Sequence, residues 1–205
     1  MLYFTGDKQA QPDKGITGLK ELSEKLNFDF FYYSELLITV GDAQKTRKAL
    51  ESVRKLYIPV YNSFFEAGNM KNRGNIRWVS FYTEGRFATI QCDFIYMISL
   101  ERERRYVITA LREEALFFDY CAYYFNGKTV LEHLEDILVI PEIDVMQCVP
   151  GVGQSSTYEW MDLLKKIQKA DEDLHLYDWT IENIKHYYKE PQPEGPMFDI
   201  KINSP

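Results

Sequence analysis

From about residue 76 onward, strand-like and helix-like segments alternate along the chain, and this alternation limits the folds that the chain can adopt. Apolar, β-branched or aromatic segments end near Cys92, Tyr124, Val149, Tyr177 and Ile200, at intervals of 23 to 32 residues. Each interval leaves room for one helix between consecutive strands. The pattern is typical of βα units with a parallel sheet, which favours either a doubly wound sheet or a (β/α)₈ barrel.

The first third of the chain has a different pattern, and we expect it to form helices. Between residues 16 and 26, isoleucine and leucine recur at spacings of three and four, which places them on one helical face. Asp42 is a suitable N-cap for a longer helix that reaches about Ala67. Because proline lacks a backbone N–H, we expect a kink or a break into two helices just before Pro59.

The sequence is short for a complete barrel. A full barrel needs eight strands and about 250 residues, whereas these 205 residues supply five or six strands. The last three residues, Asn203-Ser204-Pro205, form a helix-start pattern that no helix follows. We therefore expect one partial (β/α)₈ domain over residues 1–205 that lacks the N-terminal strands. A helical lead-in would span about 16–67, and βα units would span about 76–202.

Composition excludes several classes of protein. No apolar run approaches the roughly 20 residues of a transmembrane helix, and the first residues lack the order of a signal peptide, so we expect a cytoplasmic protein without membrane contact. The net charge of −7 and the absence of polybasic runs argue against nucleic acid as a partner. Cys92, Cys121 and Cys148 are far apart, without zinc-site spacing, and are expected to be small core residues.

Polar residues near the strands are the candidates for a site, because barrel chemistry takes place at the carboxyl ends of strands. Asp93 follows an apolar segment, where it could bind a ligand, orient a base or fix a loop. Arg86 precedes the same segment and either grips a carboxylate or lies at a surface turn. Gln91 and Gln147 are each within an apolar strand. A buried amide needs partners, so each is either a pocket residue or a hydrogen-bonding core residue.

Alternation along a strand puts Tyr124 and Asn126 on the same face. They either line a site or close the core and form the turn into the next helix. The spacing of neighbouring leucines indicates that His133 is a helix-face residue. His175 and His186 are isolated, and no histidine pair has the spacing of metal ligands.

Three segments also carry a resemblance to a known family. They are GRFATIQCDF with MIS (85–99), YYFNG with LEHL (123–134) and IPEIDVMQCVPGVGQ (140–154). Together they resemble the later part of the uroporphyrinogen decarboxylase superfamily, closest to its uncharacterised decarboxylase-like branch, over roughly residues 31–202. The resemblance implies a (β/α)₈ barrel that binds a carboxylated or tetrapyrrole-like small molecule at its mouth. It further implies decarboxylation without a cofactor, with Asp93 as the catalytic, charge-stabilising residue.

The sequence departs from the family in two places. Related corrinoid-dependent methyltransferases carry a zinc-binding His-x-Cys-Gly segment, where this chain has Tyr124-Phe125-Asn126-Gly127, so we expect no metal site. The arginine-rich N-terminal segment of true decarboxylases has no counterpart, and we expect the isolated chain to be inactive. Two alternatives stay open: a corrinoid-linked methyltransferase-like protein, and a non-catalytic remnant or half barrel that needs an N-terminal half or a second copy. The residues assigned to ligand binding are Arg86, Gln91, Tyr124, Asn126 and Gln147.

Overall fold

The computed structural model describes residues 43–76, 79, 81–92, 95, 98–151, 153–170, 172–189 and 196–200. The chain divides into two compact units, Met1–Tyr61 and Asn62–Pro205. The expected helix over residues 16–26, the cap at Asp42 and the proposed catalytic residue Asp93 lie outside the described residues.

Helix α3 extends from Ala43 to Ala67 and continues through Pro59. The predicted end near Ala67 is confirmed, and the chain forms one helix here rather than two. Pro59 removes a single backbone donor, that of its own nitrogen. The helix continues past Pro59 despite the loss of that one hydrogen bond.

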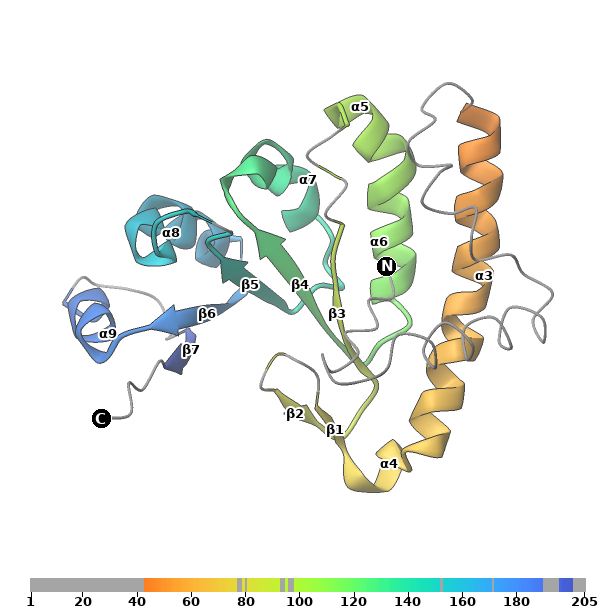
Figure 1. Cartoon of the computed structure of the whole chain (residues 1–205), viewed down its shortest axis with the longest axis horizontal. Coiled ribbons are helices and arrows are strands. Elements are labelled where there is room, and N and C mark those ends of the chain that lie inside the picture. Colours follow the sequence, from red (N-terminus) through yellow and green to blue (C-terminus); the bar gives the residue numbers. More distant parts are fainter. Residues whose placement is uncertain are drawn as a thin grey trace. The chain divides into compact units, whose positions relative to one another are not determined.

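Five strands form one parallel sheet whose order follows the chain. They are β3 (Phe87–Ile90), β4 (Tyr120–Asn126), β5 (Val145–Val149), β6 (Asp173–Trp179) and β7 (Met197–Ile200). A doubly wound sheet needs a reversal of strand order, and these five strands contain none. Because parallel crossovers are right-handed, a sequential order places every connecting helix on one face. Figure 1 shows the helices along one side of the curving sheet.

The predicted crossover helices are present, although several begin or continue as 3₁₀ or π turns. Ser99 caps the first of them and accepts a hydrogen bond from the Arg102 N–H. Thr180 caps the last through a capping box with Asn183. The helical segments are α5 (Leu100–Glu103), η2 (Arg104–Ile108), α6 (Thr109–Ala115), η3 (Lys128–His133), α7 (Leu134–Leu138), η4 (Thr157–Trp160), α8 (Met161–Lys169) and α9 (Ile181–Tyr187).

The segment before β3 forms a hairpin, although the apolar, aromatic and β-branched residues between 76 and 82 favour a single strand. After the short helix α4 (Met70–Arg73), the chain forms an antiparallel hairpin of β1 (Asn75–Ile76) and β2 (Tyr82–Thr83). Its Val79 and Phe81 are buried against Phe87 and Ala122 of the main sheet. The apolar pattern in this segment therefore reflects residues that cover the sheet, and Figure 1 shows the hairpin on the side away from α7 and α8.

The two faces of the sheet differ in chemistry. One face presents the buried row Ile90, Tyr123, Met146 and Leu174, whose members are register partners on four adjacent strands. This apolar face is the helix side. We call the opposite side of the sheet the inner face. On this face, Phe87 and Ala122 contact the hairpin near the amino ends of β3 and β4.

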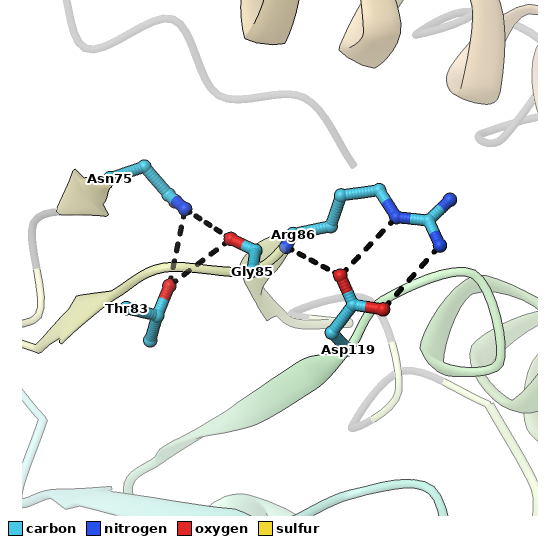
Figure 2. Close-up of polar contacts among 5 residues, drawn as sticks. All are labelled: Asn75, Thr83, Gly85, Arg86 and Asp119. Atoms are coloured by element: carbon cyan, nitrogen blue, oxygen red, sulfur yellow. Dashed lines mark hydrogen bonds and ion pairs between the residues drawn. The ribbon is translucent and has the colours of Figure 1, made fainter. Parts of the chain in front are cut away.

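Two aspartates tie neighbouring strands together at their amino ends through the same reciprocal contacts. The Asp119 carboxylate accepts a hydrogen bond from the Arg86 N–H at 2.7 Å (Figure 2). The Asp119 N–H in turn donates to the Arg86 carbonyl at 2.9 Å. Asp144 repeats the arrangement with Cys121, at 2.7 and 2.8 Å. Gly85 is required beside this contact, because a Cβ there would approach the Asp119 Cβ to 2.9 Å. The paired aspartates therefore fix where β4 and β5 begin relative to their neighbours.

We expect Asp119→Asn to remove part of the acid dependence of stability. The hydrogen bond from the Arg86 backbone, followed by its guanidinium, lowers the pKa of Asp119. Stabilisation from a lowered pKa is present above the unfolded value of about 3.9 and is lost as pH falls through the folded value. The difference in unfolding free energy between wild type and variant should shrink as pH falls below about 4. Because the Asp119 side chain is 48% exposed, this difference in unfolding free energy should stay below about 1 kcal/mol at pH 7.

Urea unfolding at pH 7 and at acid pH measures this difference, and Asp162→Asn, at an exposed position on α8, is the matched control. The same pH dependence in both variants would contradict the assignment.

Candidate functional site

Three polar side chains form a row across the inner face, near the middle of the strands. Tyr124 of β4 is the register partner of Gln147 of β5, which is the partner of His175 of β6. Register partners in a parallel sheet share a face and lie about 4.8 Å apart. We call Tyr124, Gln147 and His175 the polar row. Tyr124 and Gln147 lie two residues beyond Ala122 and Val145, which pack with the hairpin residues, and Phe81 also contacts His175.

Two members of the polar row are buried with unsatisfied polar atoms. Gln147 is 4% exposed and His175 is 1% exposed. Within the described part of the chain, neither Oε1 of Gln147 nor Nδ1 of His175 has a hydrogen-bond partner. An unpaired buried polar group costs about 1–3 kcal/mol. Two such atoms on adjacent strands indicate a position that a ligand or ordered water completes.

His175 provides a neutral imidazole to the polar row. Burial lowers the pKa of His175, and the opposing effect of the Asp199 carboxylate is smaller. The ring is therefore uncharged at neutral pH, with one nitrogen that donates a hydrogen bond and one that accepts. The ring of Phe81 contacts it edge-on, with centroids 4.9 Å apart. The arrangement can bind a polar group by hydrogen bonds, without the attraction of a formal charge.

The strand ends above the polar row are close together. Asn126, the last residue of β4, shares the inner face with Tyr124, which confirms the predicted alternation. Gly127 and Gly151 follow β4 and β5 with positive φ angles of 79° and 82°. A Cβ on Gly151 would lie 3.4 Å from the Gly127 Cα and 3.5 Å from the Asn126 Oδ1. Glycine at position 151 therefore keeps a Cβ out of the space beside the Asn126 amide.

The fold brings some of the predicted site residues together and separates others. Gln91 lies one residue beyond β3, and continuing the alternation of β3 places it on the inner face beside Tyr124. With Asn126 and Gln147, these residues share one region of the sheet. Arg86 is at the amino end of β3, where its guanidinium bonds the Asp119 carboxylate at 3.4 Å (Figure 2). The same guanidinium lies over the Phe117 ring. Arg86 therefore does not lie with the polar row.

Sequence reasoning missed His175, which it treated as isolated. A signal was present in its neighbours, because Leu174 and Leu176 flank it and both face the helices. A histidine between two such leucines must point to the opposite face of the strand. Its alignment with Gln147 depends on strand register, which the sequence pattern alone does not give.

A second polar cluster joins the first two crossovers on the helix side. His133 Nδ1 bonds Oε2 of Glu103, and the two side chains are 4% and 0% exposed. Burial raises the pKa of Glu103, and the contact with His133 acts in the opposite direction. Glu103 immediately precedes the π turn η2, a feature that is frequent at functional sites. The interpretation of His133 as an ordinary helix-face residue does not account for this contact.

The cysteines are placed as core residues rather than as nucleophiles. Cys121 and Cys148 are buried, and Cys92 is partly buried. Burial raises the pKa of the Cys121 thiol, and raises that of Cys148 to about 12, so both stay protonated at neutral pH. No cluster of three or more metal-binding side chains occurs in the described residues.

Comparison with known proteins adds no relative, because no family model, curated protein or solved structure matches this chain. Within the described ranges, the chain has no helix that combines the length and apolar character needed to cross a membrane.

Proposed function

We propose that this chain forms the later part of a uroporphyrinogen decarboxylase-like barrel and binds a carboxylated or tetrapyrrole-like small molecule at the polar row. The observation that carries the proposal is the pair of buried atoms without partners, Gln147 Oε1 and His175 Nδ1, on adjacent strands. The sequential parallel order of β3 to β7 supports it. Further units of the same kind would curve the inner face into the inside of a barrel.

The layers of the inner face suit binding at one end. Val79 and Phe81 cover Phe87 and Ala122 near the amino ends of β3 and β4, the polar row lies near the middle of the strands, and Asn126 ends β4 at the carboxyl end of the sheet. Ligands of βα barrels bind at that carboxyl end. In this proposal the described residues bind and orient the molecule without converting it, and the charge-stabilising role stays with Asp93.

Uroporphyrin, a carboxylated tetrapyrrole, is the probe for this proposal. We expect the full chain to bind it in isothermal titration calorimetry, and His175→Leu to weaken binding about tenfold, the equivalent of 1.4 kcal/mol. His186→Leu, at an exposed position on α9, is the matched control and should bind as wild type does. Circular dichroism establishes that both variants fold. Absence of binding, or equal binding by the His175 variant, would refute the proposal.

A further inference from the structure

We infer that the part of the ligand that reaches the polar row is uncharged and donates a hydrogen bond, as the N–H of an aromatic carboxamide or lactam does, and that it is not a carboxylate. This inference rests on the proposed binding at the row and goes further, because it names the chemistry of the recognised edge.

The Gln147 side chain is the first reason. Its Oε1 is a hydrogen-bond acceptor only, and it is buried without a partner in the described part of the chain. A group placed against Oε1 must therefore donate. A carboxylate brings acceptor oxygens alone, so it would leave two acceptors facing each other and would lose its own hydration.

The absence of a compensating charge on the polar row is the second reason. Burial lowers the pKa of the neighbouring His175, so the ring does not supply a positive charge at neutral pH. Its Nδ1 lacks a partner among the described residues and can accept or donate according to its tautomer. A ligand edge with a donor beside an acceptor satisfies both Gln147 and His175, whereas an anion leaves the Gln147 Oε1 without a donor.

The surroundings favour a planar ligand. Phe81 lies edge-on to His175, and Tyr124 is the register partner of Gln147 on its other side. Aromatic side chains at both ends of the polar row provide flat apolar surface for a ring. A planar ring that carries a carboxamide combines this shape with the required donor and acceptor.

The free-energy cost of the unpaired Gln147 amide oxygen can be tested by melting temperature, independently of any ligand. Gln147→Leu removes the one unsatisfied atom, Oε1, at similar volume, so the melting temperature should hold or rise by about 2–4 °C. Gln168→Leu is the matched control, because Gln168 Oε1 accepts a hydrogen bond from the Tyr187 hydroxyl at 3.2 Å. The same substitution at this partnered glutamine should lower the melting temperature.

Nicotinamide and nicotinate are a matched pair of probes. They share the same ring, which carries a carboxamide in nicotinamide and a carboxylate in nicotinate. In an NMR titration of the full chain at pH 7, we expect nicotinamide to shift signals with an affinity at least tenfold above that of nicotinate. Gln147→Leu should lose nicotinamide binding, and Gln168→Leu should keep it.

Three results would overturn the inference. Equal or tighter binding of nicotinate that depends on Gln147 would show a carboxylate site, and would leave ligand binding at the polar row standing. Binding of neither probe would exclude the carboxamide class, and the uroporphyrin titration then decides the proposed function separately. A lower melting temperature in Gln147→Leu, similar to that of Gln168→Leu, would show that Gln147 is a partnered core residue.

Discussion

Replacing His133 with alanine is expected to lower the free energy of unfolding by about 3–5 kcal/mol. The change leaves the Glu103 carboxyl group, which is 0% exposed, without the imidazole that it contacts. Its other oxygen, Oε1, already has no hydrogen-bond partner in the described ranges. Urea unfolding followed by circular dichroism measures the loss, and His186→Ala at an exposed site should change stability by about 0.5 kcal/mol or less.

The sign of the pH dependence tests the same pair. Burial raises the pKa of Glu103, Asp136 adds to that effect, and Arg104 and His133 oppose it. Without His133 the carboxyl group takes up a proton more readily. Stabilisation from a raised carboxyl pKa is present below the unfolded value of about 4.3 and is lost as pH rises through the folded value. The variant should therefore lose less stability at pH 5 than at pH 8. A loss below about 1 kcal/mol at both pH values would mean that the contact is not a stabilising one.

Trp179→Ala is expected to cost about 3–5 kcal/mol, the range for a large buried aromatic residue. The indole is fully buried and contacts the rings of Tyr158, Tyr187 and Phe198 with centroids 5.3 to 5.8 Å away. Its Nε1 donates to Thr157 Oγ1 at 2.8 Å. One side chain therefore joins β6 to η4, α9 and β7.

Urea unfolding of Trp179→Ala measures this loss, and Tyr188→Ala, at an exposed neighbour, is the matched control. A second variant, Trp179→Phe, keeps one aromatic ring and removes the hydrogen bond with part of the ring volume, so it should cost less than the alanine variant, about 1–3 kcal/mol. An equal loss in the alanine and phenylalanine variants would assign the effect to the hydrogen bond rather than to packing.

The position of Trp179 illustrates what the sequence does not reveal. Strict alternation along β6 would put it on the same face as His175. A register shift between Leu176 and Trp179 inserts one extra residue, and Asp178 adopts a positive φ of 63° there. One extra residue moves a side chain to the opposite face. Trp179 consequently packs with Phe198 on the helix side, and no local pattern predicts this bulge.

The sequence predicted the features that depend on neighbouring residues along the chain, such as the order of strands and helices. The order of strands and helices after residue 85 follows from the alternation of strand-like and helix-like segments, and the structure reproduces it. The shared face of Tyr124 and Asn126 follows from alternation alone. The hairpin before β3 was missed because apolar residues that cover a sheet resemble a strand. The His175 alignment and the Glu103–His133 contact depend on how units pack, which the sequence pattern does not specify.

The agreement between strand order and chain order has a consequence for the kinetics of folding. Each strand of the sheet pairs with one that is a single crossover away, so no loop longer than one helix and its connections must close before pairing begins. Contact order is therefore low for a parallel sheet. During synthesis β3 leaves the ribosome first, and every later strand meets an edge that already exists. The sheet can grow by addition alone, in the direction in which the chain is made.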